Sequence, residues 1–296
     1  MGMKGGRSQA SPPLRDPGGR IVNAMTVDVE DYFHVAAFES CLAPADWDRM
    51  QPRVVANTRR ILALFEARGV RATFFVLGWV AERFPRLVRE IHAAGHEIAC
   101  HGYLHRRATT QTAEEFRADV RRARDLLEDL TGHPVLGYRA PTYSIDAVRT
   151  PWAYGILAEL GFRYSSSLYP VRHDLYGRPD APRHPFPVAD GALVEIPIST
   201  LRLGGRNLPC GGGGYFRLLP WFYSRLAVQH INGRERRPYN FYFHPWEIDP
   251  GQPRLERAPW KSRLRHYTNL ARMEGKLCRL LALGTWRPMR EVYGIE

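Results

Sequence analysis

The feature that most constrains this chain is an alternation of strand-like and helix-like segments from Ile21 to about Pro170. Short apolar runs are separated by longer segments that repeat apolar residues at helical spacing. The predicted strands are Ile21–Asp28, Arg71–Leu77, Glu97–Cys100, Val135–Tyr138 and Phe162–Ser166. The predicted helices are Trp47–Arg68, Trp79–Ala94, Thr112–Thr131 and Ala153–Leu160. This alternation predicts repeated βα units built around a parallel sheet.

The second half of the chain departs from this rhythm. Sequence rich in proline and glycine runs from Tyr169 to Gly214, after which a helix is predicted at Leu218–Ile231 and a strand at Tyr239–His244. Arg254–Leu283 is predicted to be one amphipathic helix or a broken pair. We therefore expect a disordered lead-in over residues 1–20, one α/β domain over residues 21–250 with an insertion at about 171–217, and a C-terminal extension over residues 251–296.

Charge and cysteine content narrow the choice of partner and compartment. The chain has 42 Lys plus Arg against 30 Asp plus Glu, a net charge of +12, which favours polyanions such as nucleic acid, an anionic membrane surface or an acidic polysaccharide. The cations are dispersed, so we predict no nucleic-acid partner. The four cysteines form no CxxC pair. The sequence shows neither an apolar signal core nor a bilayer-spanning run, so we expect a cytoplasmic protein without a transmembrane segment.

Chemically competent side chains come directly after three of the predicted strands. A DVED run at residues 28–31 closes the first strand, His101 and His105 follow the third, and His244 ends the strand near residue 240. In βα barrels the carboxyl ends of the strands form the catalytic face. On a helical turn, the spacing of His101 and His105 would put both imidazoles on one face, which suits chelation of one metal ion.

One carboxylate and two histidines make an open ligand set, with positions left for water and substrate, as is typical of catalytic metal sites. The remaining acid is then available as a general base, and a further histidine as a general acid. Each piece has an ordinary alternative, because histidine pairs and acids at strand ends also occur as surface or core residues. Their joint occurrence at predicted strand ends favours the metal site.

Four segments in this order, TVDVEDYF, CHGYLH, YRAPTYS and FYFHPWE, resemble the successive motifs of the polysaccharide deacetylases, the NodB-homology family. The resemblance covers roughly Ile21 to Pro250. DVEDYFHV and the C-terminal extension resemble the subgroup found in exosortase/PEP-CTERM exopolysaccharide loci. The resemblance implies an α/β fold, a distorted (β/α) barrel of the polysaccharide-deacetylase type with seven strands, here followed by a C-terminal helical extension. It also implies one divalent metal ion, with zinc as the first choice.

The resemblance also implies roles for individual residues. Asp28 matches the general base that takes a proton from water, and Arg139 matches the arginine that orients this base. His244 matches the general acid that protonates the leaving amine. His101 and His105 match the two metal-binding histidines.

The carboxylate ligand is assigned less directly, because Val29 stands where the family's common first motif has a second aspartate. Glu30 or Asp31 must then supply the ligand. Strand alternation puts Glu30 on the same side as Asp28, whereas a turn after Asp28 favours Asp31. We expect Asp31 to be the ligand, with Glu30 as the alternative.

The third motif also departs from the family pattern. Thr142 intervenes between the motif's proline and Tyr143, so the N–H that would hold an oxyanion is expected in the Thr142–Tyr143 region. Ser165 stands where relatives often carry an acid, so support of the base is expected from Arg139 alone. Tyr143 and Trp246 are expected to bind the sugar.

Together these expectations describe a metal-dependent hydrolase that removes N-acetyl groups from amino-sugar residues of a polysaccharide, in exopolysaccharide biosynthesis. The expected partners are an N-acetylated glycan and exopolysaccharide-assembly proteins. The alternatives are a deacylase of the same fold acting on peptidoglycan or a small amide, and a catalytically inactive carbohydrate-binding barrel.

A glycine-rich segment, Gly204–Tyr215, invites a phosphate-loop interpretation. It lacks the GxxxxGK[ST] pattern and any following lysine, so we exclude that function. We expect a mobile loop near the substrate groove or a plain surface turn.

Overall fold

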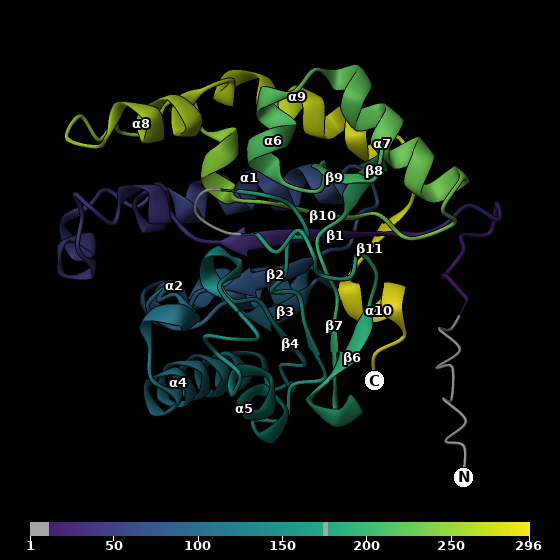
Figure 1. The fold of residues 1–296 in the computed structure, drawn as a ribbon. Coiled ribbons are helices and arrows are strands. Elements are labelled where there is room, and N and C mark those ends of the chain that lie inside the picture. Colours follow the sequence, from purple (N-terminus) through teal and green to yellow (C-terminus); the bar gives the residue numbers. More distant parts are fainter. Residues whose placement is uncertain (1–11, 174–176) are drawn as a thin grey trace, which may run out of the picture.

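The computed structural model describes residues 12–173 and 177–296, and its centre is a curled half-barrel sheet (Figure 1). Seven strands run parallel in the spatial order β10-β1-β2-β3-β4-β5-β7. They are β1 (Asn23–Val29), β2 (Thr73–Val76), β3 (Glu97–Cys100), β4 (Gly137–Tyr138), β5 (Tyr164–Ser165), β7 (Leu193–Glu195) and β10 (Asn240–Phe243). Antiparallel β6 (Phe186–Val188) extends the sheet beyond β7, and β11 (Trp286–Arg287) pairs with the start of β1. The expected α/β barrel architecture is confirmed.

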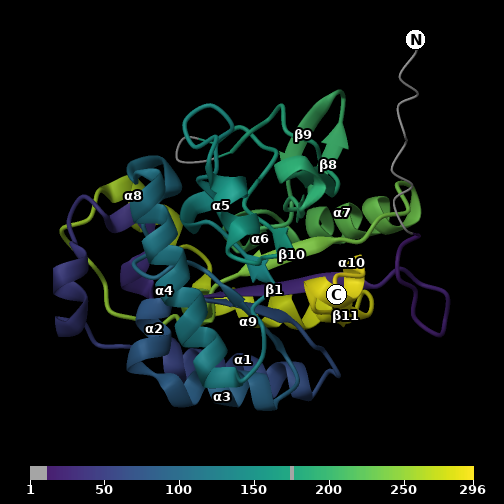
Figure 2. The same ribbon diagram turned by 90° about the horizontal axis from the view of Figure 1, so that it is seen from below.

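Helices cover the outside of this sheet. Those from the first half are α1 (Val54–Glu66), α2 (Gly78–Arg83), α3 (Pro85–Ala93), α4 (Ala113–Thr131) and α5 (Ala153–Glu159). Those from the second half are α6 (Gly213–Leu218), α7 (Trp221–Gly233), α8 (Trp260–Tyr267), α9 (Leu270–Leu281) and α10 (Met289–Tyr293). Figure 1 places α2, α4 and α5 below the strands and α6, α7 and α9 above them, and Figure 2 shows the same arrangement from below. The helical C-terminal extension is therefore confirmed.

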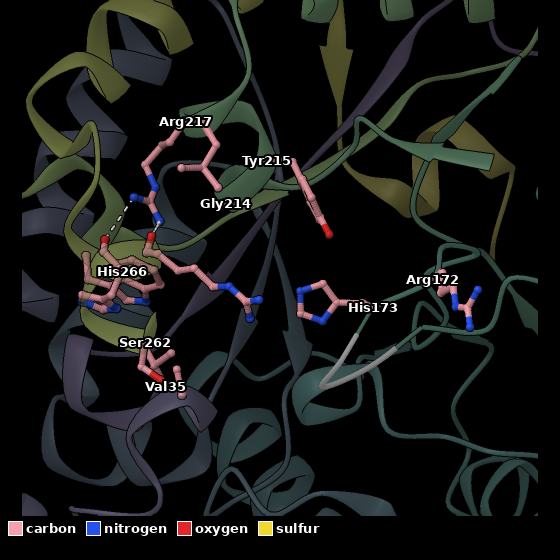
Figure 3. Close-up of a pocket in the computed structure, with 12 residues that line it drawn as sticks. Val35, Arg172, His173, Gly214, Tyr215, Arg217, Ser262 and His266 are labelled. Carbon is pink, nitrogen blue, oxygen red and sulfur yellow. Dashed lines mark hydrogen bonds between the residues drawn. The ribbon is translucent and has the colours of Figure 1, made fainter. Parts of the chain in front are cut away.

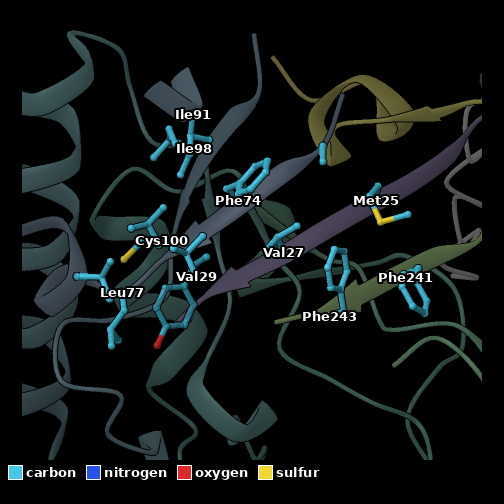
Figure 4. Packing of buried hydrophobic residues seen from close by; sticks show 14 of the residues in the cluster. Met25, Val27, Val29, Phe74, Leu77, Ile91, Ile98, Cys100, Phe241 and Phe243 are labelled. Atoms are coloured by element: carbon cyan, nitrogen blue, oxygen red, sulfur yellow. The ribbon is translucent and has the colours of Figure 1, made fainter. Parts of the chain in front are cut away.

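Strand alternation sends apolar and polar side chains of β1 to opposite sides. Met25, Val27 and Val29 pack outward into the main hydrophobic core (Figure 4). Each buried side chain of this kind stabilises the fold by about 1.5–3 kcal/mol. Thr26 and Asp28 alternate with them and point to the concave side of the sheet, where they meet Arg139. The same strand thus builds the core with one face and a polar interior with the other.

The sheet is closed irregularly between β7 and β10. Ser199 N–H donates to the Asn240 carbonyl at 3.3 Å, and Tyr242 N–H donates to the Gly211 carbonyl at 2.9 Å. A Cβ on Gly211 would lie 2.7 Å from the Asn240 carbonyl oxygen, so only glycine allows this approach. Gly211, Gly212 and Gly213 are buried. The glycines at 211–213 are therefore part of the wall of the half-barrel. Gly204 and Gly205, at the start of the same glycine-rich segment, form the exposed turn between β8 (Thr200–Leu203) and β9 (Arg206–Pro209), so the expected surface turn fits only that part.

Most predicted elements occur with shorter bounds, and prolines set the differences. The helix predicted over residues 79–94 divides at Pro85 into α2 and α3. The helix predicted over residues 218–231 is α7, which begins after Pro220, whereas α6 was not predicted. Arg254–Leu283 contains the broken pair α8 and α9. The capping box of α4 has both expected bonds, between Thr112 and Glu115.

The N-terminal segment is described only in part. The expected disordered lead-in over residues 1–20 lies outside the described residues as far as residue 11. Asp16 then accepts hydrogen bonds from Arg20 and, through Oδ2, from the Thr285 hydroxyl at 2.8 Å. Among the described residues, every helix is too short or too polar to cross a bilayer.

Candidate active site

Side chains from four separate segments meet at the carboxyl end of the parallel sheet. β1 supplies Asp28, its second-last residue, and Glu30 follows directly after the strand. The segment after β3 supplies the two histidines, the end of β4 supplies Arg139, and the end of β10 supplies His244. The predicted convergence of these residues at one edge of the sheet is therefore present.

Glu30, His101 and His105 each present one ligand atom, and the three atoms lie within 4.8 Å of one another. Glu30 Oε2 lies 2.7 Å from His105 Nε2 and 4.0 Å from His101 Nε2. Although it is buried, Glu30 Oε2 has no partner in hydrogen-bonding geometry within the described ranges. A buried carboxylate oxygen is normally satisfied. Glu30 Oε2 and one nitrogen from each histidine therefore form a donor set that fits a divalent cation.

The protein fixes the orientation of His101. Its Nδ1 lies 2.8 Å from the Arg139 carbonyl oxygen and can donate to it, which leaves Nε2 facing Glu30. Burial lowers the pKa of His101 to about 4, so the ring is neutral and able to bind a metal at neutral pH. Although burial raises the pKa of Glu30, the surrounding histidines lower it well below its usual range. The carboxylate is therefore ionised.

The two histidines are brought together by a turn and not by the expected helix. Gly102 and His105 have φ of 73° and 53°, in the left-handed region, so the chain reverses between them. The Asp119 carboxylate on α4 holds this turn by accepting from Tyr103 N–H at 2.7 Å and Leu104 N–H at 3.2 Å. Asp119 was not predicted, because its partners lie far from it in the sequence.

The structure places Glu30, and not Asp31, beside the histidines. The Asp31 carboxylate instead accepts from the N–H groups of Tyr32 at 2.9 Å, Arg53 at 2.6 Å and Val54 at 2.8 Å. The expected preference for Asp31 does not fit this geometry. β1 runs one residue beyond Asp28, to Val29, and Glu30 directly after it lies on the side of Asp28. Asp31 begins a 3-10 turn, facing away from the histidines toward the start of α1.

Arg139 is buried in the interior of the half-barrel and holds Asp28. Its Nη1 donates to Asp28 Oδ1 at 2.5 Å and to Thr26 Oγ1 at 2.8 Å. Ser166 accepts two further bonds, through its carbonyl at 3.1 Å and its hydroxyl at 3.0 Å. The guanidinium also lies 4.0 Å above the Phe75 ring. This geometry agrees with the expected role of Arg139 in orienting Asp28. Ser166 and Thr26 in turn hold the Arg139 guanidinium in place.

Ser165 stands near a second buried carboxylate that sequence reasoning missed. Glu195 at the end of β7 accepts from the N–H groups of Ser167 at 2.8 Å and Leu168 at 3.0 Å. Burial, partly offset by these hydrogen bonds, raises the pKa of Glu195 to about 7. Glu195 therefore holds the backbone beside Ser166 and reaches Arg139 only through it.

His244 lies beside Asp28 and Glu30 and is held by Glu247. His244 Nδ1 is 3.2 Å from Glu247 Oε2, while Nε2 is 3.5 Å from Glu30 Oε1 and 3.9 Å from Asp28 Oδ2. Burial alone would lower the pKa of His244, but the Glu30, Glu247 and Asp28 carboxylates outweigh it and raise the pKa to about 9. The ring is therefore a charged proton donor at neutral pH.

Glu247 is itself part of a buried ion pair. Arg217 Nε on α6 donates to Glu247 Oε1 at 2.8 Å. Although burial raises it, the cations Arg217 and His244 lower the pKa of Glu247 to about 2. A Cβ on Gly213 would lie 1.9 Å from Glu247 Oε2, so glycine is required there. The three-residue spacing of His244 and Glu247, which forms a capping box here, is the sequence signal that could have found Glu247.

Thr142 and Tyr143 both adopt left-handed backbone conformations, with φ of 57° and 49°. Two successive non-glycine residues in this region store strain, which often accompanies a functional site. Tyr143 N–H donates to the Ala140 carbonyl at 3.0 Å, so it is committed locally. The Tyr143 ring is buried and packs against Tyr242, with 5.0 Å between the ring centroids. Its main contacts are therefore in the protein interior.

Trp246 connects the site to a cavity of about 500 Å³ (Figure 3). Its indole donates to Glu30 Oε1 at 3.4 Å, and its ring stacks between His244 and His266. In Figure 3, Tyr215 and His173 point into this space. Its described lining contains no carboxylate; the residues are Val35, Ala37, Arg172, His173, Gly214, Tyr215, Arg217, Leu218, Trp246, Ser262, Arg265 and His266.

A second cavity, of about 210 Å³, is lined by His105 together with Phe33, His34 and Leu104. Val35 lines both cavities. The candidate metal ligands thus have open space on two sides, next to His105 and next to Trp246.

Two family profiles match successive parts of the chain. Residues 46–164 match the polysaccharide deacetylase family, and residues 166–294 match a domain of unknown function, DUF3473. The two matches follow one another along the chain without overlap, and neither covers half of it. The first match contains His101, His105 and Arg139, the second contains His244, and Asp28 precedes both. The site is therefore assembled from both matched regions and from β1.

The chain is also similar to individual deacetylases over part of their length. A peptidoglycan deacetylase of Helicobacter pylori is 33% identical over 109 residues, which cover 37% of this chain and 36% of the relative. A peptidoglycan-N-acetylglucosamine deacetylase of Bacillus cereus is 33% identical over 96 residues, which cover 32% of this chain and 35% of the relative. The matched stretch thus spans about a third of each relative.

A crystal structure of a candidate polysaccharide deacetylase from Mycobacterium smegmatis superimposes with a TM-score of 0.60. The alignment covers 96% of this chain and 93% of the other, at 23% sequence identity. At this identity the likeness concerns the fold.

Proposed function

We propose that this chain, in which a polysaccharide deacetylase domain is joined to DUF3473, is a metal-dependent hydrolase that removes N-acetyl groups from amino-sugar residues of a glycan. The observation that carries the proposal is the placement of three groups around one point. Glu30, His101 and His105 converge there, and the carboxylate of Asp28 and the imidazole of His244 lie beside them, 3.9 Å from each other.

The metal would be held by Glu30 Oε2 and by the Nε2 atoms of His101 and His105. When bound, a divalent ion supplies Lewis-acid polarisation of the amide carbonyl and makes water a better nucleophile at neutral pH. Zinc is the first ion to test, although this ligand set also suits other first-row metals.

The chain's own residues would move the protons. Arg139 occupies Asp28 Oδ1, so Asp28 Oδ2 is the oxygen that accepts a proton from the attacking water. Since Tyr143 N–H is committed to Ala140, Thr142 N–H is the amide we assign to the oxyanion. His244 Nε2, which faces Asp28 and Glu30, then donates a proton to the leaving nitrogen. The products are a carboxylic acid and a free amine.

The surroundings of the site support a saccharide substrate longer than one sugar. The two cavities that share Val35 flank the metal ligands, so neighbouring sugar units have space on both sides. Trp246 is assigned to the wall of the substrate site, whereas Tyr143 is assigned to shaping it from the core. The resemblance of DVEDYFHV and of the C-terminal extension supports a role in exopolysaccharide production, in the exosortase/PEP-CTERM subgroup, with assembly proteins as further partners.

Peptidoglycan is the second candidate substrate, because both relatives described above are named as peptidoglycan deacetylases. The same residues would perform the same steps on that polymer. An inactive carbohydrate-binding barrel is less favoured, since ligand set, base and acid stand together.

Acetate release distinguishes these candidates. Purified enzyme is incubated with N-acetylglucosamine oligomers, with peptidoglycan, and with the same oligomers after chemical removal of their acetyl groups. We expect acetate from the oligomers and none from the deacetylated control. Release from peptidoglycan alone would select the second candidate, and no release from either polymer by zinc-loaded enzyme would contradict the proposed function.

A further inference from the structure

Two helices of the second half begin with the same surface pattern. Residues 222–226 read FYSRL on α7, and residues 260–264 read WKSRL on α8. In both, an aromatic residue is followed by arginine at the third position and leucine at the fourth, which is the spacing of one helix face. The same pattern therefore occurs on two helices that the chain builds separately.

These faces are turned to solvent and are apolar. Phe222 is 70% exposed and Leu226 is 53% exposed, while Trp260 is 69% exposed and Leu264 is 60% exposed. The opposite face of α7 is buried through Ser224, Ala227, Val228 and Ile231. The exposed residues therefore have no part in the core. On each helix the exposed aromatic residue and leucine are one turn apart, and adjacent exposed apolar side chains of this kind mark interaction sites.

The charged residues around the two faces are almost all positive. Residues 213–233 contain two arginines and no acid, and residues 260–283 contain six cations and one acid. That acid, Glu274, is paired with Arg60. The whole chain, by comparison, has 42 cations and 30 acids. Arg225 and Arg263 make no ion pair within the described part of the chain. An anionic partner therefore complements this layer.

We propose that α7 and α8 dock this protein onto the surface of an anionic phospholipid bilayer. Phe222, Leu226, Trp260 and Leu264 enter the boundary between headgroups and acyl chains, as in other amphipathic surface helices. Arg225 and Arg263 extend along this surface to the lipid phosphates. Figure 1 shows α7 and α8 at the two ends of the same helical layer, so both belong to one side of the molecule.

The chemistry of the two faces favours a bilayer over other polyanions or a second copy. Single-stranded nucleic acid would use the arginines and stack on the aromatic rings, but neither contact buries Leu226 and Leu264. A symmetric dimer through this layer would set cations against cations, with a single acid among residues 213–233 and 260–283 to offset them. A lipid surface satisfies both the apolar side chains and the charge.

Docking also has a consequence for the site, which rests on the proposed function. Ser262 and Arg265 of α8 line the cavity beside Trp246, as does Leu218 of α6. A protein held by α8 would keep that cavity near the lipid headgroups. The glycan most accessible to it is then one carried at, or emerging from, the membrane surface.

Vesicle sedimentation of the full chain tests the proposal. The probes are vesicles of phosphatidylcholine alone and of phosphatidylcholine mixed with phosphatidylglycerol. We expect binding only to the mixed vesicles, weakened by added salt. Phe222→Ser with Trp260→Ser should abolish it, and Arg225→Gln with Arg263→Gln should weaken it by about fivefold per arginine.

Matched controls lie outside this layer. Val148→Ser removes an apolar side chain that is 83% exposed, and Arg121→Gln removes an exposed arginine on α4. Both controls should bind as wild type does. No binding to anionic vesicles, or an equal loss of binding in the controls, would overturn the proposal. A wild-type dimer that does not bind vesicles, and that dissociates in the variant with Phe222→Ser and Trp260→Ser, would also overturn it. Acetate release from soluble oligomers is measured in parallel, because vesicle binding without acetate release would contradict only the proposed function.

Discussion

The Asp28 carboxylate and the Arg139 guanidinium lie 2.5 Å apart, and neither side chain is more than 2% exposed. The two residues are 111 positions apart in the chain, so the sheet order brings them together. Arg139 covers one oxygen of Asp28 and leaves the other facing His244. This arrangement fixes the base before substrate arrives.

Asp28→Asn should therefore separate catalysis from metal binding. We expect turnover to fall by about 10²–10⁴-fold, since the base is lost, while metal content stays at the wild-type level. The unfolding free energy should fall by up to about 3–5 kcal/mol, because Arg139 keeps its charge without its anionic partner. Elemental analysis, acetate release and urea unfolding measure the three effects. Asp125→Asn, at a partly exposed pair with Arg124, serves as the control and should change each one little. Near wild-type turnover in Asp28→Asn would refute its role as base.

The metal content of Glu30→Gln and Asp31→Asn distinguishes the two candidate ligands. The sequence favoured Asp31, whereas the structure has Glu30 beside the histidines. Glu30→Gln removes the carboxylate beside the histidines, so the metal content of the purified protein should drop. Asp31→Asn should keep its metal but lower the unfolding free energy by about 1–2 kcal/mol, because Asp31 accepts three backbone N–H groups. If the metal is lost from Asp31→Asn and kept in Glu30→Gln, the ligand set is wrong.

Glu247→Gln should slow amide hydrolysis more than ester hydrolysis. Glu247 orients the proton donor His244, and an amine leaving group needs that proton whereas an aryl oxide does not. We expect kcat for N-acetylglucosamine oligomers to fall by about tenfold or more, with KM little changed and with 4-nitrophenyl acetate hydrolysis nearly preserved. A purely structural defect would reduce both reactions equally, and that result would remove Glu247 from the mechanism.

Stability should depend on pH through Glu195. Burial raises the pKa of this carboxyl from 4.5 to about 7, so the folded state keeps the proton to a higher pH than the unfolded chain does. Its contribution to stability is therefore full below about pH 4.5 and falls as the pH rises through 7. Glu195→Gln removes this change, so the variant should gain about 3 kcal/mol relative to wild type between pH 4.5 and pH 8. Urea unfolding of both proteins across this range measures the difference, and a constant difference would show that the carboxyl titrates normally.

The sequence patterns are informative wherever a strand ends in polar residues. The periodicity around Asp28, His101 and His244 predicts both the parallel sheet and the meeting of these side chains at one edge. Strand alternation also put Glu30 on the side of Asp28, which is where the structure has it, beside the two histidines. The preference for Asp31 assumed that the chain turns directly after Asp28, whereas β1 continues to Val29 and the 3-10 turn begins at Tyr32.

Other parts of the site depend on contacts that no local pattern encodes. Asp119, Ser166 and Arg217 act on partners 15 or more positions away, so only the folded chain reveals them. The glycines at 211–213 are set by the close approach of β10 and Glu247, which sequence alone does not distinguish from a flexible loop. The turn that joins His101 to His105 likewise needs Asp119 to hold it.

The central claim is that Glu30, His101 and His105 bind the one ion on which hydrolysis depends. It is tested most directly by titrating chelated enzyme with zinc and measuring acetate release against bound metal in the same samples. The account predicts that release rises in proportion to bound metal and levels off at one ion per chain, while His105→Ala neither retains the ion nor releases acetate. Undiminished release from metal-free enzyme, or full activity in His105→Ala, would contradict it.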